Sequence, residues 1–284
     1  MNEPTPEAMA LAKMPIEAPR HSSPELGELV DEAPDTMALH TREAYRLFIG
    51  RAFDGASPRA AIVGGRRVAA ALRAIWHLSG HDNPYADWVL VTIGERLVEI
   101  GSSLQRETQR GEDQLRALQQ RGLHFSVLQS RVPQRVELGF RSPYGYAVAD
   151  LVVRFDTCNR VLKTMVRKDL LPDRDGRTLI YSYTRRLRGL FEEPVRFERW
   201  LMRDELRPLS RHDFLPAAGA EASKRVQAVL ALFGPVPRDV FTGARVPRHS
   251  QRRVELTAQE LRLLQDADLS GPPAAGDSDE AALL

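Results

Sequence analysis

AIWHLSGHDNPYADWVL, residues 74–90, ends one amphipathic helix and begins the next. Gly80 is typical of a helix end, because glycine readily adopts the left-handed backbone that closes many helices. Asn83 is a favoured N-cap residue, and Pro84 suits the first helical position, where an N–H group would have no partner anyway. The stretch therefore predicts two helices joined at a short corner, with its aromatic residues in the core.

Hydrophobic periodicity extends both helices away from this corner. On the N-terminal side we expect a helix over about residues 59–79, with a start weakened by two glycines at 64 and 65. On the C-terminal side, apolar residues recur every three or four positions from Leu90 to Leu104, and the register continues to Leu118 with a polar middle near Gly111. This heptad seam fits a helical partner in the same chain, a dimer seam, or two helices broken near Gly111.

TMALHTREAYRLFIGR, residues 36–51, changes its period at Thr41. Before that point the residues alternate between two sides, with Met37, Leu39 and Thr41 on one and Thr36, Ala38 and His40 on the other, which predicts a short strand. Thr41 is a plausible N-cap for a helix over about residues 42–53. Residues 123–127 and 136–140 also alternate, and we interpret them as a β-hairpin with a longer loop.

The rest of the chain is predicted to be largely helical. We expect helices over about residues 143–169, 177–192 and 219–233, with a turn at 172–176 between the first two. Thr257 and Glu260 form a capping box that starts a short final helix. The fold class is therefore mostly α with a few short strands (α+β).

Charge divides the chain into three parts. Residues 1–35 hold two cations against eight acids, residues 254–284 hold one against seven, and residues 36–253 carry a net charge of +14. We expect a disordered acidic arm at 1–35, a basic helical body at 36–253, and an acidic tail at 254–284 with one short helix and otherwise disordered. A body this basic favours polyanionic partners, nucleic acid first among them.

Several functional classes lack support in the sequence. Cys158 is the single cysteine, so the chain offers neither an internal disulfide nor a cysteine zinc site, which fits a reducing cytoplasm. No apolar run is long enough to span a membrane. His77 and His81 are spaced like metal ligands, but they border a helix corner, where structural roles are commoner. We expect no enzyme, no cofactor, no metal and no small-molecule substrate.

Three quoted segments carry a family resemblance: residues 36–51, residues 74–90, and FRSPYGYAVADLVVRFD at 140–156. They resemble segments of a bacterial family encoded on integrating conjugative elements, the AcaB-like transcriptional activators of conjugative plasmids. The resemblance covers roughly residues 36–250. It implies a DNA-binding regulator of transfer genes, with a ribbon-helix-helix type of DNA binding.

A ribbon-helix-helix element has a strand followed by two helices, and two chains each supply one strand of the ribbon. The strand at 36–41 with helices at 42–53 and 66–79 has this order, which predicts a homodimer on double-stranded DNA. A rival placement uses the strand at 135–140 and the helix at 143–169. The alternative function is a non-enzymatic structural or assembly factor for transfer or element maintenance that binds protein rather than DNA.

The DNA contacts are expected from the outward strand positions and from dense basic clusters, which bind phosphate with little discrimination between bases. The candidate residues are Thr36, His40, Arg42, Arg46, Lys163, Arg167, Arg185, Arg186, Arg188, Arg252 and Arg253.

Overall fold

The computed structural model describes residues 27, 29–52, 61–254, 256–267 and 269. It divides into one unit over residues 1–33 and a second over residues 34–284. Every helix and strand described below lies in the second unit. Most of the predicted acidic arm at 1–35, and the end of the predicted tail at 270–284, lie outside the described residues.

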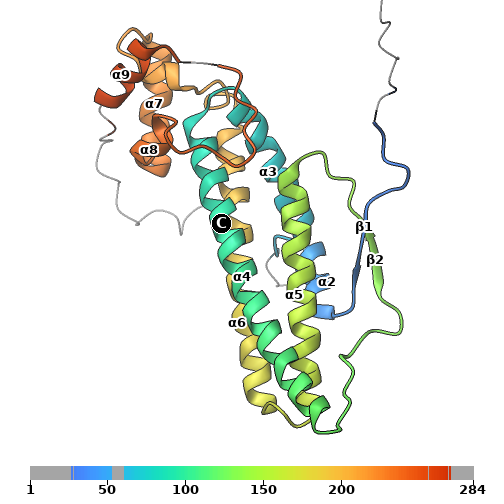
Figure 1. Cartoon of the computed structure of the whole chain (residues 1–284). Helices are drawn as coiled ribbons and strands as arrows, with labels where there is room; N and C mark the ends of the chain where they lie inside the picture. Colours follow the sequence, from blue (N-terminus) through green and yellow to red (C-terminus); the bar gives the residue numbers. More distant parts are fainter. Residues whose placement is uncertain (1–26, 28, 53–60, 255, 268, 270–284) are drawn as a thin grey trace, which may run out of the picture. The chain divides into compact units, whose positions relative to one another are not determined.

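Four helices form the body of the second unit: α3 (Gly65–Gly80), α4 (Pro84–Gln120), α5 (Pro143–Arg167) and α6 (Asp173–Leu201). The long helices α4, α5 and α6 run alongside one another (Figure 1), and α3 packs against all three. The prediction of a mostly α fold with few strands is confirmed.

The helix corner forms as expected from its capping residues. The Asn83 side chain accepts hydrogen bonds from the backbone N–H groups of Tyr85 and Ala86, each at 3.0 Å. Pro84 occupies the first position of α4. The short helix α2 (Arg42–Ile49) begins in the same manner after Thr41, whose hydroxyl accepts from the backbone of Ala44.

Two strands form an antiparallel ribbon, and their pairing corrects the expected hairpin. Strand β1 (Thr36–Leu39) pairs with β2 (Gln134–Glu137), whereas residues 123–127 form no strand. The hairpin prediction was wrong because the segment before β2 bonds to a helix instead. Leu128 donates its N–H to the Thr164 hydroxyl at 2.9 Å, and the Arg160 side chain donates to the Leu128 carbonyl at 2.9 Å.

The pairing of β1 also differs from the ribbon-helix-helix expectation. That expectation left the strand at 36–41 without a partner in its own chain, and the structure supplies one in β2. Met37 and Leu39 are buried, and β1 packs on α5. These apolar side chains therefore belong to the core of a single chain and need no second copy to cover them.

Two helices are longer than their sequence patterns predict. Helix α4 passes through Gly111 unbroken, and its apolar seam residues from Leu90 to Leu115 are buried within the chain. Helix α6 starts at Asp173 and continues through Pro194 to Leu201, instead of covering about 177–192. Pro194 is buried, and Phe197 beyond it stacks on Phe233 at 4.3 Å between ring centroids, so packing holds the helix together after the proline.

A smaller group of elements closes one end of the bundle in Figure 1: the 3-10 helix η2 (Arg211–Phe214), α7 (Ala220–Phe233), α8 (Arg238–Phe241) and α9 (Ala258–Asp266). Helix α9 begins with the predicted capping box, in which the Glu260 carboxylate accepts from the Thr257 N–H at 2.7 Å. Leu264 and Leu269 are buried in the common core, so this end is part of the folded unit.

Candidate nucleic-acid interface

The β1–β2 ribbon has one buried and one exposed face. Residues directly opposite each other on paired strands share a face, and successive residues alternate between faces. Met37 and Val136 are opposite each other and buried. The exposed pairs are Thr36 with Glu137 and Ala38 with Arg135. The ribbon therefore offers a small polar surface while its apolar side packs on the chain's own core.

A buried carboxylate fixes the junction between β1 and α2. Asp156 on α5 is 2% exposed. It accepts from the backbone N–H of Thr41 at 2.7 Å, from the Thr41 hydroxyl at 2.6 Å, and from the backbone N–H of His40 at 3.1 Å. A buried charge is tolerated when it has several such donors. Asp156 thus holds the ribbon and the start of α2 at a defined position on α5.

The side chain of His40 ties a further segment to this junction. Its Nδ1 atom accepts from the backbone N–H of Ser130 at 3.2 Å, which requires Nδ1 to be unprotonated. Beside it lies a hollow of about 310 Å³. The lining residues are Leu39, His40, Thr41, Arg42, Tyr45, Arg46, Ser130, Val132 and Gln134. The structure therefore places His40, Arg42 and Arg46 around one hollow.

A second hollow, of about 510 Å³, lies among α2, α5 and α6 and contains Lys163 and Arg167. Lys163 pairs with Glu43 on α2 at 2.7 Å. Burial raises the pKa of Glu43, but the hydrogen bond from Lys163 and the backbone outweigh it, so the pKa falls below its ordinary value. Lys163 is therefore occupied internally, whereas Arg167 is exposed.

Arg131 and Arg135, which the sequence reasoning did not select, complete the ribbon surface. Both are exposed, and they lie just before and within β2. Arg131 lies within the loop that was interpreted as a hairpin connection, and Arg135 directly follows it. Their chain neighbours Ser130, Val132 and Gln134 line the same hollow as Arg42 and Arg46, and the pairing of β2 with β1 was needed to show this. Their signal in the sequence is the pattern RVPQR, in which two cations bracket a proline.

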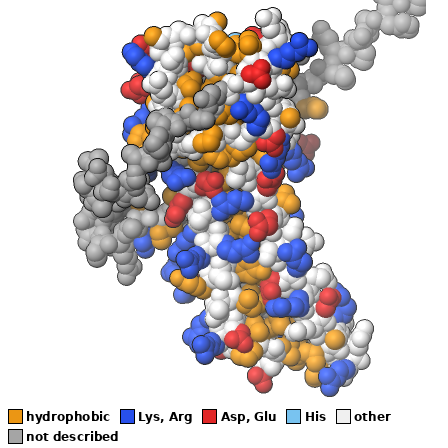
Figure 2. Space-filling model, turned by 90° about the vertical axis from the view of Figure 1, so that its left-hand side faces the viewer, with side chains coloured by type: hydrophobic (Ala, Val, Ile, Leu, Met, Phe, Trp, Pro, Cys, Tyr) orange, Lys and Arg blue, Asp and Glu red, His pale blue; other side chains and the backbone are white. Residues whose placement is uncertain are grey.

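The α6 cluster of Arg185, Arg186 and Arg188 is exposed, but it is partly engaged within the chain. Arg186 pairs with Glu99 on α4 at 3.0 Å and lies over the Tyr183 ring at 5.9 Å. On the face that Figure 2 shows, cationic and acidic side chains are interspersed and do not form one continuous basic patch. This pattern is what a solvated helix surface with local ion pairs looks like.

Arg252 and Arg253 occupy different environments. The side chain of Arg252 is 17% exposed and pairs with Asp82 at 2.8 Å, and burial lowers its pKa. Arg253 is exposed. The segment that carries both is fixed on the helix corner, because the Trp76 indole donates to the His249 carbonyl at 2.9 Å. Arg252 therefore serves an internal contact in this structure, whereas Arg253 faces solvent.

The largest buried polar group was missed from sequence. Arg211 is fully buried in η2. Its guanidinium group pairs with Asp82 at 2.7 Å and Asp87 at 2.8 Å, and it also donates to the carbonyls of Val240 and Phe241. It therefore joins the helix corner to α8, and this role is structural.

The described residues contain no group of three or more histidine, cysteine or acidic side chains that could hold a metal ion. Burial raises the pKa of the Cys158 thiol to about 12, so the thiol stays protonated and unreactive at neutral pH. None of the described helices combines the length and the apolar character that a membrane span requires. The polar ribbon surface is thus the leading candidate for a functional contact in this part of the chain.

A family model described as "Transcriptional regulator AcaB" matches residues 25–253. A search of curated proteins finds no match. Among solved structures, the crystal structure of selenomethionine-containing AcaB from uropathogenic E. coli aligns with a TM-score of 0.42 and 16% sequence identity, covering 59% of this chain and 79% of that one.

Proposed function

We propose, from the premise that this chain belongs to the AcaB family of transcriptional regulators, that it binds double-stranded DNA and regulates the transfer genes of an integrating conjugative element. A two-stranded ribbon fits the major groove, where base edges can be read. The proposed contact surface is the exposed face of the ribbon together with the start of α2.

The observation that carries this proposal is the state of four arginines around the ribbon. Arg42, Arg46, Arg131 and Arg135 are all exposed, and across the part of the chain that is described none of their guanidinium groups makes an ion pair. Some cations nearby do have internal partners, as Lys163 has in Glu43. Exposed guanidinium groups that are not held in an ion pair are available to contact phosphate or guanine.

We extend the proposal to a homodimer, but this dimer does not depend on a ribbon built from one strand of each chain. Each chain already has a two-stranded ribbon, and the described sheet leaves one edge of β1 without a strand. An open edge can accept a strand from a second copy, and two copies would place two ribbons on neighbouring half-sites. Sedimentation as a monomer at micromolar concentration, with DNA binding intact, would remove the dimer from the proposal.

Fluorescence anisotropy with duplexes from the element's own promoter regions tests DNA binding. A duplex of the same length and scrambled sequence serves as the control. We expect tighter binding to promoter DNA, and a log–log salt slope of up to about −3.6 if four cations each contact a phosphate. Absence of binding at low salt would favour the alternative class, a non-enzymatic assembly factor that binds protein.

A further inference from the structure

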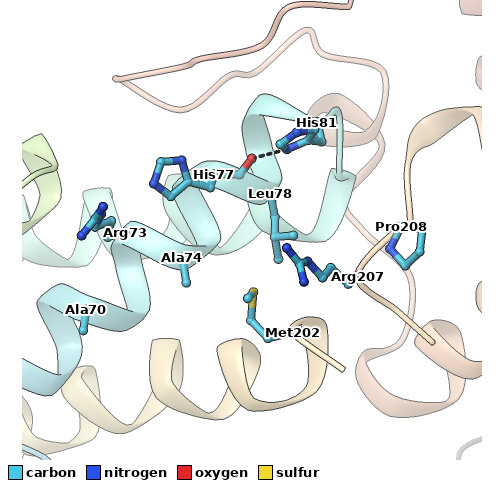
Figure 3. Close-up of a pocket in the computed structure, with 9 residues that line it drawn as sticks. All are labelled: Ala70, Arg73, Ala74, His77, Leu78, His81, Met202, Arg207 and Pro208. Atoms are coloured by element: carbon cyan, nitrogen blue, oxygen red, sulfur yellow. Dashed lines mark hydrogen bonds between the residues drawn. The ribbon is translucent and has the colours of Figure 1, made fainter. Parts of the chain in front are cut away.

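A groove of about 890 Å³ lies between the outer face of α3 and the chain that follows the end of α6 (Figure 3). Its lining residues are Ala70, Arg73, Ala74, His77, Leu78, His81, Met202, Arg207 and Pro208. This volume is within the range of sites that hold a small organic ligand. No lining residue belongs to the ribbon surface or to the start of α2, so the groove is a separate feature.

Two rows of side chains on α3 give the groove its chemistry. Residues four apart lie above one another on a helix. Ala70, Ala74 and Leu78 form an apolar row, and Met202 and Pro208 face it from beyond α6. Because alanine is small, this row leaves space at the surface where a larger side chain would fill it. The result is an apolar floor with room for a flat or extended hydrocarbon.

The second row makes the rim cationic. Arg73, His77 and His81 follow one another at the same spacing, and the His81 Nδ1 atom donates to the His77 carbonyl at 2.8 Å. The lining contains no acidic residue. Within the described ranges, neither Arg73 nor Arg207 makes an ion pair, although their neighbour Arg67 pairs with Glu198 at 2.6 Å. Arg73 and Arg207 therefore give the rim a positive charge that no ion pair among the described residues neutralises.

We propose that this groove binds a small amphiphilic anion, in which a carboxylate, sulfonate or phosphate head is attached to an apolar body. The body lies on the row from Ala70 to Leu78 and against Met202. The head is held by Arg73 or Arg207, the two guanidinium groups of the rim. An apolar floor alone would accept a neutral ligand equally well, so the charge of the rim is what selects an anion.

The test uses the full chain and two fluorescent probes of similar shape. 8-Anilinonaphthalene-1-sulfonate carries an anionic head, and N-phenyl-1-naphthylamine has the same aromatic body without charge. We expect one saturable sulfonate site per chain and weaker binding of the neutral probe. Arg73→Ala with Arg207→Ala should weaken sulfonate binding roughly tenfold or more, as expected for lost charge-assisted hydrogen bonds, and should leave the neutral probe unchanged.

Two further variants locate the site. Ala70→Trp should fill the groove and abolish binding of both probes, because Ala70 lines it. Ala70 is exposed, so the substitution should leave the core intact. Arg188→Ala, a matched loss of an exposed arginine on α6, should change neither affinity. Unlabelled decanoate should displace the sulfonate probe at a concentration at least about tenfold lower than decanol requires.

Several outcomes would overturn the proposal. Equal sulfonate affinity in the double arginine variant, or equal affinity for both probes in the wild type, would show an apolar patch without anion selection. Retained binding in Ala70→Trp would place the probe elsewhere. Displacement of the probe by a peptide of residues 270–284 but not by decanoate would assign the groove to an acidic segment of this chain. None of these results depends on whether the protein binds DNA.

Discussion

At the scale of single residues, Asp156 controls the position of the proposed DNA-binding surface. It is buried on α5 and receives its hydrogen bonds from His40 and Thr41, where β1 ends and α2 begins. Asp156→Asn replaces one acceptor oxygen with an NH₂ group that faces other donors. We expect a loss of about 2–3 kcal/mol in the free energy of unfolding, measured by urea denaturation.

The matched control is Asp150→Asn on the same helix. Asp150 is exposed and pairs only with Arg154, at 2.7 Å, so this change should cost less than about 0.5 kcal/mol. Equal effects of the two substitutions would mean that the contacts of Asp156 contribute nothing beyond those of a surface carboxylate.

The buried Arg211 links three segments, and its loss should affect the whole unit. Arg211→Met would leave Asp82 and Asp87 buried with one cation fewer, and we expect destabilisation by about 3–5 kcal/mol in thermal or urea unfolding. Arg211→Lys should recover only part of it, because an ammonium group cannot make the forked contacts of a guanidinium. Its exposed neighbour His212, changed to Ala, is the control. Full recovery by lysine would show that charge alone suffices.

The proposed interface is distinguished from the α6 cluster by a pair of double variants. Arg42→Ala with Arg46→Ala should weaken DNA binding and reduce the log–log salt slope by up to about 0.9 per lost contact. Arg185→Ala with Arg188→Ala removes the same charge from exposed positions on α6 and should leave both quantities near their wild-type values. Anisotropy titrations at several salt concentrations measure both. The opposite ranking would place the interface on α6.

At the scale of elements, two glycines in α4 allow opposite predictions. A Cβ atom at Gly111 would lie 2.4 Å from Val161 Cγ1 and 2.8 Å from the Met165 sulfur on α5, whereas a Cβ atom at Gly94 meets nothing within 4 Å. Alanine favours a helix over glycine by about 1 kcal/mol, but overpacking a core costs about 1–3 kcal/mol. Gly94→Ala should therefore stabilise the protein, and Gly111→Ala should destabilise it.

Thermal unfolding of the two variants measures this difference directly. If Gly111→Ala also stabilised the protein, α4 and α5 could not be packed as closely at Gly111 as the structure shows. The comparison is informative because both substitutions lie in one helix and change its intrinsic propensity by the same amount.

Local signals predicted most helix starts correctly. Thr41, Asn83 and the capping box at Thr257 each act through hydrogen bonds to residues two or three positions away, so a sequence window contains the whole interaction. The strand at 36–39 and its buried face were predictable for the same reason, since alternation is a local pattern. The candidate residues around His40, Arg42 and Arg46 followed from it.

Interactions between distant segments could not be predicted in this way. The partner of β1 lies almost a hundred residues away, and nothing in either strand of four residues specifies the other. A proline inside a helix costs about 3 kcal/mol, so Pro194 indicates a helix end. Only the packing of Phe197 beyond it shows why α6 continues. Arg211 resembles any surface arginine in sequence, because its acidic partners lie more than a hundred residues earlier.

At the scale of the whole molecule, the dominant property is the segregation of charge. Residues 36–253 carry a net charge of +14, whereas residues 1–35 and 254–284 each carry −6. The folded unit does not follow these boundaries. Arg238 donates to the carbonyls of Leu264 at 3.0 Å and Ala267 at 2.9 Å, and Leu264 is fully buried. A fragment that ends at residue 253 would therefore lose part of its core.

The acidic segments should compete with DNA phosphate for the cations of the body, and charge neutralisation tests this without truncating the core. Asp277→Asn, Asp279→Asn and Glu280→Gln in the full chain remove three negative charges from residues 270–284, which contain no cation. We expect DNA affinity to rise by roughly tenfold or less at low salt, because fewer acidic side chains then compete with the DNA phosphates for the cations of the body. The gain should shrink as salt screens the competition, and a melting temperature equal to that of the wild type is the control for folding. A gain that persisted unchanged at high salt would point to a contact that is not electrostatic. No gain at any salt concentration would show that the acidic segment and the DNA do not share a surface.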